Sequence, residues 1–320
     1  MSGDFYYIYI YLRCIVFILY YIILSVNFMN DTTILLPNVN ENLWIDFNMD
    51  DIMDEFFWYL DHPEGSQSLV CRRNKIIKYF QQNIFFKKER ELWQNDYIKS
   101  KLIDNRCKYL SKRPEELTTY DILSGFKKSA IWYGYSGFNP QLCKWFYNHI
   151  AEKYNIKTED IICYDPCGGW GHRMIGSTEI KKYIYNDIGP EVSRGVKNMK
   201  DFFDLCNAEI HCGDAREWIP DDNYNVIFTC PPYYNIEIYE CDEFKSRDEY
   251  NNLIDSLFNT FYNKESCKVF GMIIREDMLE FKWKNIADEI IPLTGYASKH
   301  LVGTADHKKK EYLYVWKKEY

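Results

Sequence analysis

Residues 226–234 read Val-Ile-Phe-Thr-Cys-Pro-Pro-Tyr-Tyr, an apolar run that stops at two consecutive prolines. The β-prone side chains of 226–229 predict a strand. Proline has no N–H to give to a sheet and restricts the residue before it, so the strand must end in a stiff turn. In open α/β sheets, ligands bind at the carboxyl ends of the strands. The turn at 230–233 would present carbonyl groups and the ring of Tyr233 at that edge; the simpler alternative is a packed tyrosine after a proline-terminated strand.

Strand patterns alternate with helix patterns through the second half of the chain. We predict strands at 161–164, 183–186, 209–211, 226–229, 269–274 and 312–316, and helices at 140–154, 191–205, 248–261 and 283–290. Such alternation is typical of a doubly wound, mostly parallel α/β sheet, and we expect the short last strand to be antiparallel. Between 66 and about 110, apolar residues recur at spacings of three and four, which predicts an N-terminal helical region.

The chain of 320 residues is long enough for a catalytic domain with an appendage. We divide it into an apolar segment at 1–28, an acidic arm and helical region at 29–115, and an α/β domain at 116–320. The net charge is −8, yet 29–64 alone hold nine acids and no Lys or Arg, so the rest of the chain is close to neutral. The acidic balance therefore does not argue against a nucleic-acid partner. We interpret the arm as a solvated surface helix rather than a DNA mimic.

The segment from Phe5 to Phe28 is almost wholly apolar and aromatic. Its length suits a membrane span, which needs roughly 20 apolar residues. It lacks the basic start and the cleavage site of a signal peptide. It is either a membrane anchor or an over-extended start with Met29 as the functional initiator. We favour the second interpretation because everything downstream is typical of a soluble intracellular protein, cytoplasmic or nuclear.

The 11 cysteines are scattered, with no C-x-x-C pair and no zinc-finger spacing. This pattern predicts free thiols and a reducing compartment, and it provides no metal site.

A second motif, Asp165-Pro-Cys-Gly-Gly-Trp-Gly171, follows the first predicted strand of the α/β domain. Three glycines in a strand-to-helix turn allow tight backbone angles and close approach to a ligand. The turn lacks the Gly-Lys-Ser/Thr ending of a P-loop, which argues against nucleotide triphosphate hydrolysis. Asp187, at the end of the next strand, occupies a position where a carboxylate typically binds ribose hydroxyls. Asp214 follows the third strand and is placed to meet an adenine edge. One such acid is more often a helix cap, but three at successive strand ends favour a ligand site.

Taken together, these segments resemble the S-adenosylmethionine-dependent amino-methyltransferases of DNA. The resemblance rests on Asp165–Gly171, Asn186-Asp187, Gly213-Asp214-Ala215, Phe228–Tyr233 and Ser136-Gly-Phe-Asn-Pro140, the last being similar to the family segment that closes over the cofactor. Those enzymes methylate the exocyclic N6 of adenine or N4 of cytosine. The resemblance covers about the last three-fifths of the chain. It implies a Rossmann-like methyltransferase fold, S-adenosylmethionine as the cofactor, DNA as the partner, and no metal.

The resemblance also implies roles for individual residues. The catalytic residues would be Cys230, Pro231, Pro232 and Tyr233. The cofactor-binding residues would be Phe138, Asp165, Cys167, Gly169, Gly171, Asp187, Asp214 and Ala215. Tyr233 would stack on a flipped base. Target recognition would fall within 30–115 or 234–247.

Two positions depart from the family pattern. Cys167 replaces the usual aromatic residue, which changes the packing near the methionine part of the cofactor. Cys230 stands where an Asp, Asn or Ser usually accepts a hydrogen bond from the target amine, and a thiol is a weak acceptor. The carbonyl of Pro231 would then carry more of that task.

Three alternatives remain beside amine methylation of DNA. The target could be RNA or another amine such as guanine N2, because related folds share the Pro-Pro-aromatic turn. The unusual Cys230 and Cys167 would also suit a non-catalytic protein that binds the cofactor or nucleic acid. Covalent C5-pyrimidine methylation by Cys230 is disfavoured, since the cysteine of that family follows its proline.

Overall fold

The computed structural model describes residues 47–69, 71, 73–111, 117, 119, 123, 125–126, 137–234, 244–294 and 310–318. The apolar segment 1–28 lies outside the described residues, as do the start of the acidic arm and the segment 235–243. Within the described part of the chain, no helix is long and apolar enough to cross a membrane. The domain boundary at 115/116 stays a prediction.

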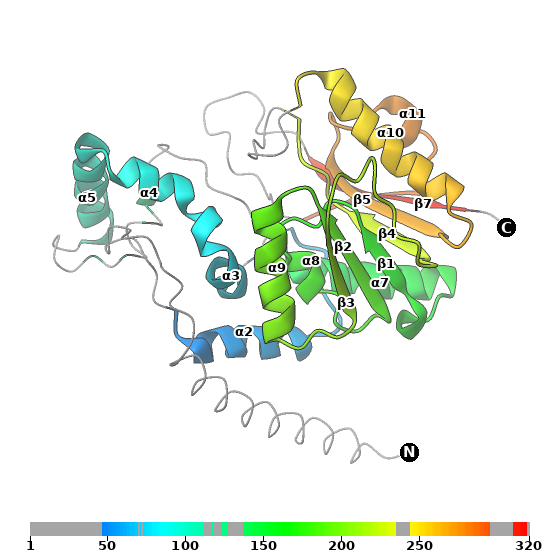
Figure 1. Cartoon of the computed structure of the whole chain (residues 1–320), viewed down its shortest axis with the longest axis horizontal. Helices are drawn as coiled ribbons and strands as arrows, with labels where there is room; N and C mark the ends of the chain where they lie inside the picture. Colours follow the sequence, from blue (N-terminus) through cyan, green and yellow to red (C-terminus); the bar gives the residue numbers. More distant parts are fainter. Residues whose placement is uncertain are drawn as a thin grey trace, which may run out of the picture. The chain divides into compact units, whose positions relative to one another are not determined.

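Seven strands form one sheet in the order β3-β2-β1-β4-β5-β7-β6 (Figure 1). Their bounds are β1 Ile162–Asp165, β2 Lys182–Asp187, β3 Ala208–Cys212, β4 Val226–Thr229, β5 Val269–Arg275, β6 Glu289–Pro292 and β7 Glu311–Lys317. The strands β1 to β5 pair in parallel, whereas β7 runs antiparallel to both β5 and β6. This confirms the doubly wound, mostly parallel sheet and the antiparallel last strand.

The predicted helix at 283–290 is wrong. The helix α11 spans only Phe281–Lys284, and the edge strand β6 begins at Glu289. The stretch Glu289-Ile-Ile-Pro292 pairs with β7 and alternates partly buried with exposed side chains, the period of a half-buried strand. Pairing with a strand more than twenty residues away therefore overrides the local helix pattern.

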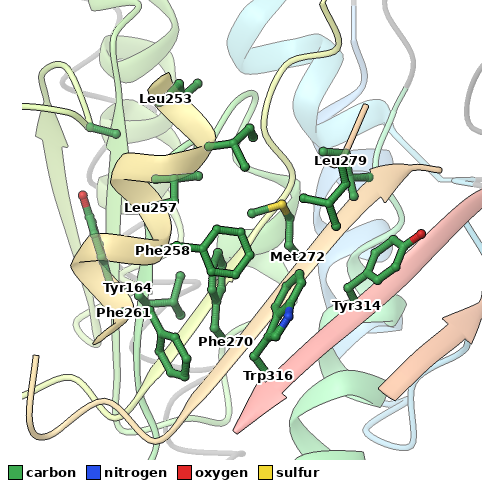
Figure 2. Packing of buried hydrophobic residues seen from close by; sticks show 14 of the residues in the cluster. Tyr164, Leu253, Leu257, Phe258, Phe261, Phe270, Met272, Leu279, Tyr314 and Trp316 are labelled. Atoms are coloured by element: carbon green, nitrogen blue, oxygen red, sulfur yellow. The ribbon is translucent and has the colours of Figure 1, made fainter. Parts of the chain in front are cut away.

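The helix α10 (Arg247–Asn263) covers one face of the sheet. It begins at Ser246, whose side chain accepts a hydrogen bond from the backbone N–H of Glu249 at 3.1 Å, a typical N-cap. Its buried side packs on β4, β5 and β7 (Figure 2). There the ring of Phe258 stacks on Trp283 at 3.8 Å and meets Trp316 edge-on at 4.7 Å. This aromatic cluster joins α10 to α11 and β7.

Another long helix, α7 (Pro140–Tyr154), packs its Phe146 ring on Phe228 of β4 at 4.1 Å. It begins at Asn139, whose side chain accepts from the backbone N–H of Gln141. Proline at the first helical position suits this start, because its missing N–H would have no partner there. The core residue Phe228 thus ties α7 to the strand that ends at Cys230.

The remaining helices are α2 Met49–Leu60, α3 Lys75–Phe85, α4 Lys87–Trp93, α5 Asp96–Leu110, α8 His172–Ile175 and α9 Pro190–Phe202. They confirm the N-terminal helical region. The α2 helix is not solvated all round: Phe56 stacks on Phe203 at 4.1 Å. The buried carboxylate of Glu55 accepts from the backbone N–H groups of Lys75 and Ile76 and so caps α3. The acidic arm therefore has a buried structural face.

Candidate active site at the carboxyl edge of the sheet

The polar residues singled out in the sequence meet at one edge of the sheet. Asp165 ends β1, Asp187 ends β2 and Thr229 ends β4, while Asp214 follows β3. The strands β2 and β4 flank β1 on opposite sides and run parallel to it. The strand order therefore reverses beside β1, and a crevice at such a switch point is the usual ligand site of open α/β sheets.

The carboxylate of Asp165 is fully buried and holds this edge together. One oxygen accepts from Arg173 Nε at 2.6 Å and from the Tyr183 hydroxyl at 2.5 Å; the other accepts from the Thr229 hydroxyl at 2.9 Å and from Arg173 Nη2 at 3.3 Å. Four donors thus engage its two oxygens. Asp165 as a cofactor contact stays a prediction, and the observed contacts are those of a residue that positions the glycine turn.

The glycine turn is joined directly to the Pro-Pro turn. Thr229, the last residue of β4, donates to Asp165 and accepts from the backbone N–H of Cys167 at 3.3 Å. Arg173 completes the link by donating Nη2–H to the carbonyl of Cys167. The two turns are therefore joined by side-chain hydrogen bonds from Thr229 and Arg173.

Two glycines of the turn have backbone angles that favour glycine, Gly169 with φ +58° and Gly171 with φ +91°. Their surroundings differ. A Cβ on Gly171 would meet the Met199 and Val196 side chains of α9, so this glycine serves packing. A Cβ on Gly169 would have no atom of the described residues within 4 Å, so open space lies in front of it in this part of the structure. Of the two, Gly169 faces the room that a ligand needs.

The carboxylate of Asp187 accepts from the backbone N–H groups of Gly169 at 2.8 Å and Gly189 at 2.9 Å. Burial raises its pKa, and these two hydrogen bonds oppose the rise. Beside it, Asn186 is fully buried and donates to the carbonyls of Pro166 and Gly213. The Oδ1 atom of Asn186 is buried and has no hydrogen-bond partner among the residues that the structure describes. Such an atom calls for an explanation, and a bound ligand is one.

After β3, Asp214 accepts from the backbone N–H and the side chain of Arg216, with Nη2–Oδ2 at 2.5 Å. These hydrogen bonds lower the pKa of Asp214. Ala215 is buried in the hydrophobic cluster under α10. Asp214 and Ala215 as cofactor contacts stay predictions: Asp214 is paired with Arg216, and Ala215 is packed into the core.

The Pro-Pro turn has a buried and a more open side. Pro231 and Tyr233 are buried, whereas Cys230, Pro232 and Tyr234 are partly exposed. Tyr233 is only 4% exposed and belongs to the cluster under α10, so the alternative of a packed tyrosine describes this structure. Its stacking on a base stays a prediction.

The segment that was expected to close over the cofactor is described from Gly137 onward. The Phe138 ring meets Phe228 edge-on at 6.4 Å and lies 5.1 Å from the Arg173 guanidinium carbon. Gly137 passes close to His172: a Cβ built on it would be 3.1 Å from Nε2. That nitrogen is buried and has no hydrogen-bond partner in the described ranges of the chain. Burial and the neighbouring Arg173 lower the pKa of His172 to about 3, so its imidazole is neutral at physiological pH.

Sequence reasoning missed the roles of Arg173, Tyr183 and His172. Each lies within a segment expected to form a helix or a strand, and its residue type carries no signal there. Only the folded sheet brings Tyr183 of β2 and Arg173 of α8 to Asp165. Among the described residues, no group of three or more His, Cys, Asp or Glu side chains could hold a metal ion.

The strand order with its reversed β7 and the glycine turn after β1 define a Rossmann-like methyltransferase fold. No protein-family model matches the sequence, and no curated protein matches it. Among solved structures, a dimethyladenosine transferase from Plasmodium falciparum is similar at 16% identity and a TM-score of 0.37, over 54% of this chain and 61% of that chain. The METTL16 methyltransferase domain is similar at 6% identity and a TM-score of 0.39, over 56% and 68% of the two chains. The 23S rRNA methyltransferase ErmE is similar at 10% identity and a TM-score of 0.38, over 54% and 67%. The match thus spans less than two thirds of the Plasmodium protein.

Proposed function

We propose that the protein is an S-adenosylmethionine-dependent methyltransferase that methylates an exocyclic amine of a nucleobase, N6 of adenine or N4 of cytosine, in DNA. One observation carries the proposal: the Thr229 hydroxyl bridges Asp165 of the glycine turn and the backbone of Cys167. The turn proposed to hold the cofactor and the turn proposed to hold the amine are thereby joined within one hydrogen-bond network.

The residues present fit such a cofactor. Open space lies in front of Gly169, and a long side chain at this position would fill it. Two polar atoms of this edge, Asn186 Oδ1 and His172 Nε2, are buried and have no partner among the described residues. Asp187, fixed by Gly169 and Gly189, would take the ribose hydroxyls, because its oxygens still have lone pairs beyond the two backbone hydrogen bonds. When bound, the cofactor would supply the electrophilic methyl group on its sulfonium.

The chain's own contribution is to position the amine. An exocyclic amine conjugated to its ring is a poor nucleophile, and hydrogen bonds from its N–H groups help to localise the nitrogen lone pair. The Cys230 thiol is a weak acceptor, so the carbonyl of Pro231 would accept the stronger of these hydrogen bonds. Holding the amine in line is worth several orders of magnitude in rate without a strong base.

RNA is the second candidate substrate, because a base amine in RNA presents the same two N–H groups to the turn. The full chain would be incubated with labelled S-adenosylmethionine and either DNA or RNA, and the nucleosides would be analysed by mass spectrometry. We expect a methylated adenine or cytosine amine in DNA. Label in RNA alone would make RNA the substrate, and label in neither would overturn the proposal.

A matched pair of variants at Gly169 tests the cofactor cradle. Gly169→Ala and Gly169→Leu both carry the strain of a positive φ, which costs on the order of 1–2 kcal/mol. Only leucine extends into the open space. We expect Gly169→Leu to lose cofactor binding in calorimetry while unfolding at the same temperature as Gly169→Ala. Equal affinity of the two variants would place the cofactor elsewhere.

A further inference from the structure

A cavity lies on the face of the sheet covered by α10. Its volume is about 350 Å³, and it is lined by Arg216, Ile219, Tyr224, Ser256, Asn259, Thr260, Asn263 and Lys264. The connection between β3 and β4, residues 213–225, contains only turns, so no helix lies beside α10 there. The lining residues of α10 recur at spacings of three and four and form one polar stripe along the helix.

Two of the lining residues, Tyr224 and Ser256, carry buried hydroxyls. Neither hydroxyl has a hydrogen-bond partner within the part of the chain that the structure describes. Tyr224 is fully buried, although a tyrosine hydroxyl in a core usually finds a partner. Removing such a group from water without compensation costs about 1–3 kcal/mol, which a bound ligand would recover.

One cation of the cavity is available to an anion. Lys264 Nζ lies 5.1 Å from the centre of the Tyr224 ring and donates to the carbonyls of Pro220 and Asp221 at 3.5 and 3.2 Å. Within the described part of the chain, no carboxylate forms an ion pair with it. Arg216, by contrast, is already paired with Asp214. Lys264 therefore brings an uncompensated positive charge to the cavity that these two hydroxyls line.

Most of the cavity lies away from the methyl-transfer edge, and Arg216, which lines the cavity, also pairs with Asp214 at that edge. Tyr224 precedes β4 and Cys230 follows it, so the four-residue strand puts about 13 Å between them. At the active-site end of α10, the Arg247 guanidinium lies 5.7 Å from the Tyr234 ring. Lys264 follows the other end of this 17-residue helix, about 25 Å away.

We propose that this cavity binds a nucleoside monophosphate, with the phosphate at Lys264 and the hydroxyls of Tyr224 and Ser256. Lysine is a common phosphate ligand, and hydroxyls can donate to phosphate oxygens. The volume is within the range of sites for small organic ligands, larger than a bare phosphate needs. At the exposed rim, the amides of Asn259 and Asn263 stand one helical turn apart and offer the donor and acceptor pairs that read a base edge. The monophosphate is either a free nucleotide or one nucleotide of a polynucleotide.

The test uses calorimetry on the full chain with cytidine 5′-monophosphate, cytidine and inorganic phosphate as probes. We expect the monophosphate to bind more tightly than either part alone. Tyr224→Phe should weaken its binding about 5- to 10-fold, the worth of one hydrogen bond, and should not lower the unfolding temperature, because the hydroxyl has no partner among the described residues. Lys264→Met should weaken binding further. Tyr262→Phe, which removes an exposed hydroxyl from the same helix, is the matched control and should change nothing.

Two further arms complete the experiment. Binding that persists in Gly169→Leu shows that the probe does not occupy the cofactor cradle, so this proposal can fail or hold independently of the proposed methyl transfer. A single-stranded oligonucleotide that displaces the monophosphate identifies a polynucleotide as the source, and no displacement identifies the free nucleotide. Absence of binding, or binding that is equal in wild type, Tyr224→Phe and Lys264→Met, would overturn the proposal.

Discussion

Two Arg–Asp pairs lie at the same edge of the sheet and differ mainly in their contact with water. Arg173 Nε lies 2.6 Å from Asp165 Oδ2, with side chains 6% and 0% exposed. Arg216 Nη2 lies 2.5 Å from Asp214 Oδ2, with side chains 35% and 18% exposed. The first pair joins the end of β1 to α8, and the second joins neighbours two positions apart in one turn. The contact distances are nearly equal, so distance alone does not rank the two pairs.

Burial ranks them. Taking an ion pair out of water costs several kcal/mol per ion, so removing one partner of a buried pair leaves a charge that nothing compensates. An exposed pair is hydrated with or without its partner and contributes little. The buried pair should therefore control folding and the geometry of the glycine turn, while the exposed pair should adjust only the local loop.

The largest effect is expected from Arg173→Met. It leaves the Asp165 carboxylate buried without its cation, and we expect a loss of about 3–5 kcal/mol in the free energy of unfolding, measured by urea denaturation. The double variant Asp165→Asn with Arg173→Met removes both charges and should recover roughly half of that loss. If Arg173→Met lowered the free energy of unfolding by no more than Arg216→Gln does, the ranking of the two pairs by burial would be wrong.

An intermediate effect is expected from Thr229→Val, which keeps the side-chain shape and removes the hydroxyl that bridges the two turns. The expected loss is about 1–3 kcal/mol, together with slower methyl transfer, because Asp165 and the N–H of Cys167 each lose a partner. Thr178→Val is the matched control, since the Thr178 hydroxyl is buried and makes no hydrogen bond to any described residue. Equal losses from the two variants would show that the bridge contributes nothing.

The smallest effect is expected from Arg216→Gln, at most about 1 kcal/mol at neutral pH. Hydrogen bonding from Arg216 lowers the pKa of Asp214 in the folded state. A carboxyl group with a lowered folded pKa stabilises the fold at neutral pH, and this stability is lost as the pH falls through that pKa. The difference between wild type and variant should therefore shrink between about pH 7 and pH 3, and also in high salt. A difference that grows in acid would rule out this role for the pair.

Sequence patterns located the strand ends well because the rules involved are local. The run Val226–Thr229 ends at Pro-Pro, and the glycine turn follows β1 within a few residues. The strand β6 escaped prediction because Glu289–Pro292 is short and gains its conformation from pairing with β7. Tyr233 was taken as a stacking platform because its neighbours in the chain are prolines, while its burial comes from α10.

The sequence by itself determined the fold class, the order of the motifs and the residue types offered at four strand ends, because hydrophobic periodicity and proline or glycine geometry act over a few residues. Only the tertiary structure decided which of those side chains are already engaged by ion pairs or hydrogen bonds within the protein. Asp165 and Arg173 are joined across β1 and α8, and a neutral His172 lies beneath Gly137. The unpartnered hydroxyls of Tyr224 and Ser256 meet only when α10 packs beside the β3–β4 connection. The burial of a side chain and its hydrogen-bond or ion-pair partners depend on segments that are distant in the sequence and packed together in the fold. A local stretch of sequence therefore does not determine them.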